Sequence, residues 1–116
     1  MYRLFVYGTL KSGEPFNHLL GSKPVLIIKS LPIYELIDLG DYPGLVENGK
    51  TSIIGEVYCV SDEIVRVLDK YEGDEYIRKE IKLVDGSIAQ TYVYIVPNKN
   101  PVYPKIRSGE WKSSSK

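Results

Sequence analysis

The sequence has very few of the side chains that usually carry nucleophilic, redox or metal chemistry. Among 116 residues there is one histidine, His18, and one cysteine, Cys59. A single cysteine excludes a disulfide within the chain, and no cluster of His, Cys, Asp and Glu has the spacing of a metal site. Nothing in the sequence places a nucleophile beside His18, as a Ser–His or Cys–His pair would require. We therefore expect neither a metal nor another cofactor.

The chain also lacks net charge and long hydrophobic runs. Its 15 basic side chains balance 15 acidic ones, so the positive charge typical of a nucleic-acid partner is missing. The apolar run at residues 25–28, like the others in the chain, is far too short to cross a bilayer. Met1 leads directly into Tyr2-Arg3-Leu4-Phe5-Val6, without a charged leader or a small-residue cleavage site. We expect a soluble, cytoplasmic protein with no nucleic-acid or membrane partner.

What is abundant favours β-strands. The chain has 10 tyrosines, many valines and isoleucines, and a single alanine, and β-branched and aromatic side chains suit strands. The pattern predicts strands over residues 2–7, 25–30, 33–38, 52–60, 76–83 and 87–96. The first is apolar on both faces and should be a central strand, and Asp85-Gly86 predicts a hairpin between the last two. Residues 41–44 predict a turn, and Gly55 indicates either a β-bulge or a close approach of another chain segment.

One main helix is predicted between Ser61 and Gly73, with a short helix near residues 16–20. Ser61 is a favourable N-cap, and Gly73 is a suitable residue to end the helix. A predicted apolar stripe on the helix consists of Ile64, Val67, Leu68 and Tyr71. We expect a single domain over residues 1–112, with a disordered tail at 113–116. The expected fold is α+β, with a small closed or nearly closed, mixed or antiparallel β-barrel-like sheet.

Tyr7-Gly8-Thr9-Leu10, at the end of the first strand, is one candidate site. Glycine lets the backbone approach a ligand closely, and the N–H groups that follow are no longer used by the strand ladder. Consecutive free amides form a concavity that suits a carboxylate or a developing oxyanion. The alternative is an ordinary transition from strand to loop.

Glu72, in the last turn of the main helix, is the second candidate. The helix C-terminus carries partial negative charge, and Asp69, Asp74 and Glu75 are close in sequence. Both effects disfavour the ionised carboxylate, so we predict a raised pKa, as a general acid/base requires near neutral pH. The alternative is a solvated, acidic helix end.

Two other side chains have simpler structural interpretations. Cys59 lies in an apolar strand and is expected to be a buried thiol. Arg78 alternates with Tyr76 and Glu80 on one face of a strand, and we expect it to pair with Glu72 or Glu80.

Several segments, taken together and in order, resemble the gamma-glutamylcyclotransferase-like superfamily, and most closely its gamma-glutamylamine cyclotransferase branch. The matching segments are residues 4–13 (LFVYGTLKSG) with 17–18, 42–45 (YPGL), 55–58 (GEVY), 68–73 (LDKYEG) with Tyr76 and Arg78, and 108–111 (SGEW). The resemblance covers about residues 3–111 and rests on the combination of the Tyr-Gly-Thr-Leu turn with the distant Glu-Gly helix end.

The resemblance implies a metal-independent enzyme that closes a gamma-glutamyl amide on itself. The α-amine of the substrate would attack its own γ-carbonyl, releasing 5-oxoproline and a free amine or amino acid. By the same resemblance, Glu72 is the catalytic general acid/base. Tyr7, Gly8, Thr9 and Leu10 would bind the glutamyl group through their main chain. Tyr103 falls near a family position that contacts substrate.

Three other functions remain open at this stage, as does the oligomeric state. The same fold could act on a gamma-glutamyl dipeptide or remove a gamma-glutamyl group from a metabolite. It could also be a small-ligand-binding module without catalytic activity. A tyrosine-rich barrel could stack single-stranded nucleic acid, although the clustered positive charge of such proteins is missing.

Overall fold

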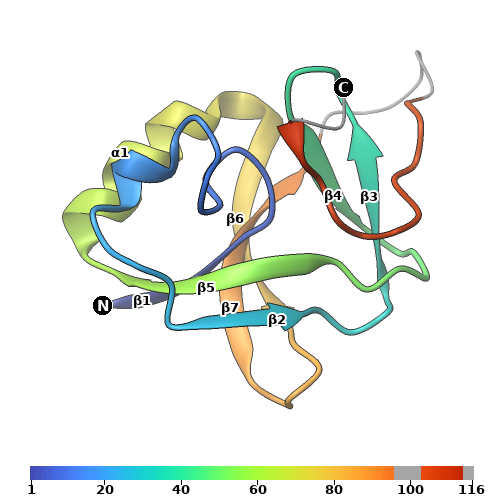
Figure 1. The fold of residues 1–116 in the computed structure, drawn as a ribbon, viewed down its shortest axis with the longest axis horizontal. Helices are drawn as coiled ribbons and strands as arrows, with labels where there is room; N and C mark the ends of the chain where they lie inside the picture. The colour runs from blue at the N-terminus through green and yellow to red at the C-terminus, as the bar shows by residue number, and fades with distance from the viewer. Residues whose placement is uncertain (96–102, 114–116) are drawn as a thin grey trace.

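Seven strands and one α-helix make up the computed structural model, which describes residues 1–95 and 103–113 (Figure 1). The strands are β1 (Tyr2–Val6), β2 (Leu26–Lys29), β3 (Tyr34–Asp38), β4 (Pro43–Glu47), β5 (Ile54–Val60), β6 (Tyr76–Lys82) and β7 (Ile88–Tyr94). The helix is α1 (Asp62–Glu72), and two short 3₁₀ turns are η1 (Asn17–Leu20) and η2 (Gly73–Glu75). Of the tail predicted to be disordered, residues 114–116 lie outside the described residues.

The strands form one curled sheet in the order β2-β5-β1-β7-β4-β3, with β6 paired to the other edge of β7. β7 is parallel to both β1 and β4 and antiparallel to β6. A bridge between Ser30 and Leu83 connects the chain after β2 with the chain after β6. The sheet therefore curves into a half-barrel with α1 at one side, which confirms the expected α+β fold (Figure 1).

β1 is the central strand that the sequence predicts, because its two faces contribute to two different hydrophobic clusters. Phe5 and Tyr7 pack with the residues inside the curved sheet, and Leu4 and Val6 pack with the residues under α1. Gly55 lies on β5 beside the end of the antiparallel β1, and a Cβ there would be 2.5 Å from Phe5 Cζ. The predicted close approach at Gly55 is confirmed.

The helix begins and ends as predicted, but its buried face is rotated. Ser61 Oγ accepts a hydrogen bond from the Ile64 N–H at 3.3 Å, as an N-cap should. Val65 and Leu68 are the buried residues, whereas Val67 is 54% exposed and Tyr71 40% exposed. The predicted stripe was therefore wrong at Val67 and at Tyr71.

Two further predictions about the strands are corrected. The segment predicted as a turn, residues 41–44, instead leads into β4, because Pro43 is tolerated as the first residue of a strand. Cys59 is exposed rather than buried, since it lies on the outward side of β5 between the buried Tyr58 and Val60. An apolar strand in this fold does not bury every side chain.

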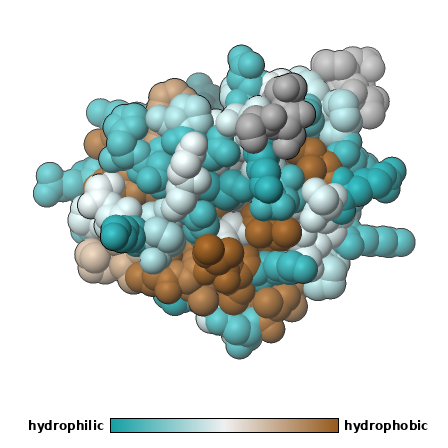
Figure 2. Space-filling model, in the orientation of Figure 1, coloured by the Kyte–Doolittle hydropathy of each residue, from teal (hydrophilic) through white to brown (hydrophobic). Residues whose placement is uncertain are grey.

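The outer surface of β2 carries an apolar patch. Val25, Leu26 and Ile27 are exposed there, and Figure 2 shows the hydrophobic surface over this edge strand. None of the three lines the cavity that contains Glu72, so the patch is not part of that site.

The hydroxyl of Tyr7 bridges β7 and β4 just beyond the end of β1. It donates to the Tyr92 carbonyl oxygen at 2.6 Å and accepts from the Leu45 N–H at 3.0 Å. β1 and β4 pair with successive parts of the same edge of β7, so a side chain satisfies the backbone groups between them. Tyr7 is 6% exposed, and burial raises the pKa of its hydroxyl far above the ordinary value.

We predict that Tyr7→Phe lowers the free energy of unfolding. The substitution leaves a buried N–H on β4 and a buried C=O on β7 without their partner, which typically costs about 1–3 kcal/mol for each group. Denaturant unfolding of the variant measures the loss. Tyr42→Phe is the matched control, because its hydroxyl lies on a side chain that is 40% exposed. Equal stability of wild type and Tyr7→Phe would show that the bridge does not hold the strands.

Candidate active site

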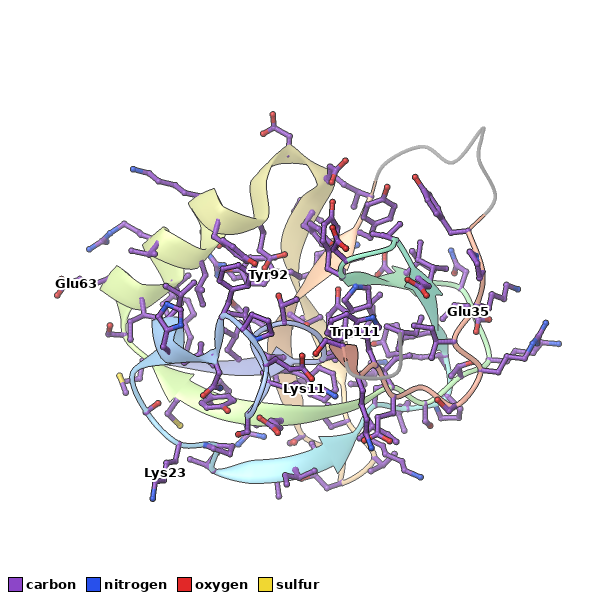
Figure 3. All side chains as sticks on the ribbon, turned by 45° about the horizontal axis from the view of Figure 1, so that its top comes forward. Lys11, Lys23, Glu35, Glu63, Tyr92 and Trp111 are labelled. Carbon is purple, nitrogen blue, oxygen red and sulfur yellow. The ribbon has the colours of Figure 1, made fainter. Side chains whose placement is uncertain are left out.

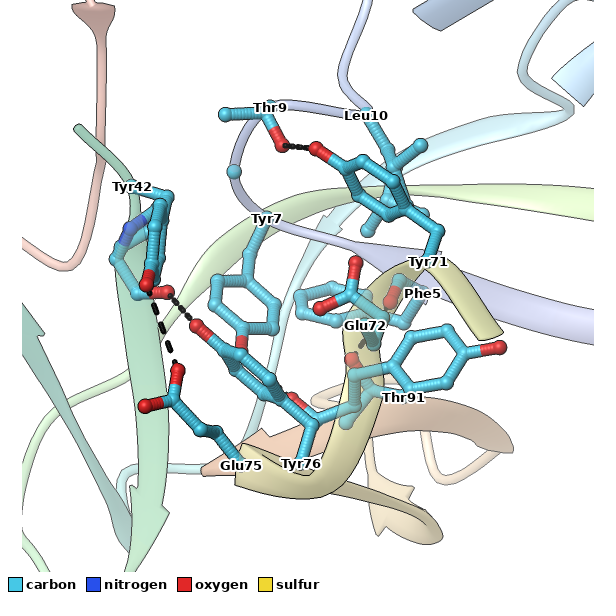
Figure 4. A pocket seen from close by; sticks show the side chains of 14 residues that line it. Phe5, Tyr7, Thr9, Leu10, Tyr42, Tyr71, Glu72, Glu75, Tyr76 and Thr91 are labelled. Carbon is cyan, nitrogen blue, oxygen red and sulfur yellow. Dashed lines mark hydrogen bonds between the residues drawn. The ribbon is translucent and has the colours of Figure 1, made fainter. Parts of the chain in front are cut away.

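A cavity of about 320 Å³ opens where β1 and β4 separate (Figure 4). Four parts of the chain line it: residues 5–10, residues 42–43, the end of α1 through the start of β6, and the middle of β7. Gly8 and Glu72, 64 positions apart, contribute to the same cavity. The structure therefore brings together the two segments that the sequence singles out.

The turn after β1 presents unpaired backbone donors at this cavity. Within residues 1–95 and 103–113, the N–H groups of Gly8, Thr9 and Leu10 donate to no acceptor. The turn is closed instead by the Lys11 N–H, which donates to the Gly8 carbonyl oxygen at 3.0 Å. Only glycine fits at position 8, because a Cβ there would lie 2.8 Å from the ring of Pro43. The turn at the cavity therefore has the three free amides that the sequence predicts.

A polar network behind the turn fixes its shape. Asn17 Nδ2 donates to the Leu10 carbonyl oxygen at 2.8 Å and to the Tyr58 hydroxyl at 2.9 Å. Tyr58 in turn donates to Glu56 Oε1 at 2.8 Å, and the same oxygen accepts from the Ser12 N–H at 2.8 Å. All of these residues lie in the segments that carry the family resemblance.

Lys11 connects the turn to the C-terminal part of the chain. Its Nζ donates to the Trp111 carbonyl oxygen at 2.6 Å, and the two residues lie beside each other in Figure 3. Lys11 is 7% exposed, and burial lowers the pKa of its ammonium group. The contact explains how residue 111, far away in sequence, supports the turn at the cavity.

Glu72 is the titratable group with unusual properties at this site. Its side chain is largely buried and its carboxylate points into the cavity (Figure 4). Burial raises the pKa of this carboxyl to about 7. No described residue donates a hydrogen bond to the carboxylate, so nothing offsets the loss of solvation. The pKa of Glu72 is shifted upward as predicted, but the cause is burial and not the charge of the helix end.

Tyrosine side chains surround Glu72, from every element packed around it. They are Tyr7 after β1, Tyr71 of α1, Tyr76 of β6 and Tyr92 of β7. Burial raises the pKa of each hydroxyl, and the nearby Glu72 charge adds to the effect, so all four stay protonated near neutral pH. These four side chains are therefore polar without being charged. The abundance of tyrosine was the sequence signal for this wall.

Further hydrogen bonds hold the rim of the cavity (Figure 4). The Tyr76 hydroxyl donates to the Pro43 carbonyl oxygen at 2.8 Å, and the Tyr42 hydroxyl to Glu75 Oε1 at 3.4 Å. The Tyr71 hydroxyl lies 3.5 Å from Thr9 Oγ1, which connects the helix end to the turn. Sequence reasoning assigned no role at the site to Tyr42, Tyr76 or Glu75.

Arg78 has a different partner from the predicted ones, and Tyr103 lies outside the set of residues that line the cavity. Arg78 pairs with Asp69, its Nε 3.0 Å from Oδ1, and not with Glu72 or Glu80 as predicted, because Asp69 lies directly across from it on α1. Tyr103 is hydrogen-bonded to Tyr94 and is not among the described residues that line the cavity.

The described residues provide no cluster of three or more His, Cys, Asp or Glu side chains suited to a metal ion. Among the same residues, no helix combines the length and the hydrophobicity that crossing a membrane requires.

The family model described as "Gamma-glutamyl cyclotransferase, AIG2-like" matches residues 4–113. The chain belongs to this family. The resemblance carried by the Tyr-Gly-Thr-Leu turn and the Glu-Gly helix end is thereby confirmed.

Relatives of this family member cover nearly the whole chain. A Vibrio cholerae protein named "Putative gamma-glutamylcyclotransferase" is 39% identical over 112 residues, 93% of either chain. The gamma-glutamylcyclotransferase family protein YtfP of Escherichia coli K12 is 35% identical and covers 98% of this chain and 99% of its own. The solution structure of ytfP from E. coli superposes with a TM-score of 0.68 over the same shares of the two chains, again at 35% identity. The crystal structure of c4763 from uropathogenic E. coli superposes with a TM-score of 0.83 at 23% identity, covering 98% and 94%.

We predict that the stability of this family member falls as pH rises between 4.5, the ordinary pKa of glutamate, and about 7. The folded state holds the Glu72 proton in this range and the unfolded state releases it, so ionisation favours unfolding. The decline attributable to Glu72 amounts to about 3 kcal/mol by this linkage. Unfolding measured against pH for Glu72→Gln should lack this decline.

Glu63→Gln is the control for this experiment, because Glu63 lies on the same helix and points away from the protein (Figure 3). It should keep the pH dependence of the wild type. An identical pH dependence for wild type and Glu72→Gln would contradict a buried carboxyl at position 72.

Proposed function

We propose that this chain is a cyclotransferase that cleaves a gamma-glutamyl amide, releasing 5-oxoproline and a free amine or amino acid. Membership of the gamma-glutamylcyclotransferase family supports this reaction. The observation that carries the proposal is a carboxyl group with a pKa of about 7 in the same cavity as three free backbone amides. Glu72 is the general acid/base of the reaction.

The substrate supplies its own nucleophile in this mechanism. Its α-ammonium group gives a proton to the Glu72 carboxylate, and the freed amine attacks the γ-carbonyl carbon. A tetrahedral intermediate forms with a positively charged ring nitrogen. Glu72 gives its proton to the leaving nitrogen, and the bond to that nitrogen breaks. The regenerated carboxylate then takes the second proton from the ring nitrogen and passes it to the freed amine. One carboxyl with a pKa near neutral pH serves these transfers, because it holds and releases a proton with similar ease.

The cavity contributes by holding the substrate in a folded conformation. An extended gamma-glutamyl chain must bend until its amine meets its own carbonyl, and fixing that geometry can supply much of the rate enhancement. The amides of Gly8, Thr9 and Leu10 suit either the α-carboxylate or the oxyanion of the intermediate. Because the attack is intramolecular, the proposed mechanism uses neither a serine or cysteine nucleophile nor a metal ion.

The charge of the cavity favours an amine over an amino acid as the leaving group. Among the described residues that line the cavity, two are acidic, Glu72 and Glu75, and none is lysine, arginine or histidine. A leaving group with its own carboxylate would be brought close to Glu75 without a compensating cation. Like charges placed together in this way cost binding energy.

We predict that Glu72→Gln folds normally and releases 5-oxoproline at least about 100-fold more slowly than wild type, the usual contribution of a general acid/base. Glutamine keeps the size of the side chain and removes its ability to carry the proton. Chromatographic quantification of 5-oxoproline from a gamma-glutamyl alkylamine measures the rate, with Glu63→Gln as the control. A wild-type rate in Glu72→Gln would exclude the assignment. Tight binding of 5-oxoproline by wild type without any turnover would instead indicate a binding module.

A comparison of two substrates tests the leaving group. We predict a kcat/KM about tenfold or more higher for gamma-glutamyl-propylamine than for gamma-glutamyl-alanine, because only the latter brings a second carboxylate near Glu75. Glu75→Gln should narrow the ratio by improving turnover of the dipeptide. A higher kcat/KM for the dipeptide in wild type would overturn the preference for amines.

A further inference from the structure

The end of α1 that carries Glu72 has little hydrophobic support. The buried residues of the helix, Val65 and Leu68, come before its last turn. From residue 69 to residue 75 no side chain is fully buried, and Gly73, with φ of +73°, ends the helix directly after Glu72. Hydrophobic packing alone therefore does not fix the direction of the Glu72 side chain.

Asp69 connects this helix end to two strands. It lies three residues before Glu72, so the two side chains are neighbours on the helix surface. Arg78 of β6 donates from Nε to Asp69 Oδ1 at 3.0 Å and from Nη2 to Oδ2 at 3.2 Å. The hydroxyl of Tyr92, on β7, donates to Asp69 Oδ1 at 2.7 Å. A two-pronged arginine–carboxylate pair fixes direction as well as distance.

The partners of Asp69 are themselves held in place. Arg78 Nη1 also donates to Gln90 Oε1 of β7, and its guanidinium lies 5.1 Å from the ring centroid of Tyr2. Its orientation is therefore set by β1 and β7 as well as by the helix.

Tyr92 connects the ion pair to the cavity. The residue lines the cavity of Glu72, and it also lines a second hollow formed with Asp69, Tyr76, Ile77 and Arg78. Its hydroxyl is bound to Asp69, and its ring lies beneath α1 (Figure 3). Tyr92 thus lies between the Asp69–Arg78 ion pair and the cavity that contains Glu72.

We propose that Asp69, Arg78 and Tyr92 form a positioning unit that holds the last turn of α1 against β6 and β7 and keeps Glu72 directed into the cavity. The role rests on the proposed function, in which Glu72 moves the proton. Asp69 and Arg78 touch no substrate; they act through the position of Glu72. Without the unit, the helix end would move outward and Glu72 would gain water.

Asp69→Asn tests the proposal, because it keeps the size of the side chain and removes the charge that binds Arg78. We expect the pKa of the Glu72 carboxyl to move from about 7 toward its ordinary value of 4.5. Carbon-detected NMR of glutamate-labelled protein measures this titration, with Glu72→Gln to assign the signal. The titratable groups that face Glu72 are Tyr7, Tyr71, Tyr76, Tyr92 and Glu75, together with Asp69 on its own helix.

Turnover provides a second readout of the same variant. We expect kcat of Asp69→Asn to fall by about 10- to 100-fold, the scale of a small displacement of a catalytic group, while KM changes little. The acid limb of the pH–rate profile should move to lower pH together with the NMR titration. Arg78→Gln should give the same two shifts, and the double variant should be no worse than the single ones.

Glu47→Gln is the matched control. Glu47 pairs with Lys79 at 2.9 Å, and its side chain is 45% exposed, against 40% for that of Asp69. Loss of this ion pair should leave the titration of Glu72, kcat and KM as in wild type. An unchanged Glu72 titration in both Asp69→Asn and Arg78→Gln would overturn the positioning role.

The two readouts separate this proposal from the proposed function. If wild type releases no 5-oxoproline, the cyclotransferase assignment fails, and the NMR titration alone then supports or overturns the positioning of Glu72. If Asp69→Asn does not fold, Arg78→Gln decides, because Arg78 does not line the cavity and Asp69 keeps its bond to Tyr92.

Discussion

The separation of β1 and β4 along one edge of β7 is the constraint on which the rest of the structure depends. A continuous ladder would leave no space at this point, and a simple gap would leave buried backbone groups without partners. The Tyr7 hydroxyl resolves the conflict, because it donates to the carbonyl of Tyr92 and accepts from the N–H of Leu45. The strands can therefore part without loss of hydrogen bonding, and the cavity opens beside them.

The distribution of charge around this cavity is what gives Glu72 its chemistry. Tyrosines that stay protonated surround the carboxyl, so burial is not offset by a cation and the pKa rises to about 7. Arg78, predicted as a partner of Glu72 or Glu80, is paired with Asp69 instead, and its hydrogen bond lowers the pKa of the Asp69 carboxyl. The pKa values of two acids one helical turn apart are thus shifted in opposite directions, down for Asp69 and up for Glu72. The N–H groups of Gly8, Thr9 and Leu10, which have no acceptor among the described residues, lie at the same cavity.

Local sequence patterns were enough to predict most of the helices and strands, but not the contacts between residues far apart in sequence. The central position of β1, the cap at Ser61 and the Asp85-Gly86 hairpin follow from neighbouring residues, and all three occur. The strand beginning at Pro43 was missed, because a Pro-Gly pair has the local character of a turn and only pairing with β3 and β7 makes it a strand. Glu72 was singled out as a candidate from its position at the helix end and from the family motif. The partner of Arg78 and the burial that raises the pKa of Glu72 depend on how α1 packs against β6 and β7, which no local pattern contains.

The account is tested most directly by a crystal structure of the protein with bound 5-oxoproline. The lactam should occupy the cavity between the turn at Gly8 and the helix end. One of its oxygens should accept hydrogen bonds from the N–H groups of Gly8, Thr9 or Leu10, and the Glu72 carboxyl should lie within hydrogen-bond distance of the ring nitrogen. A product bound elsewhere, or a Glu72 side chain turned away from a product in the cavity, would contradict the central claim.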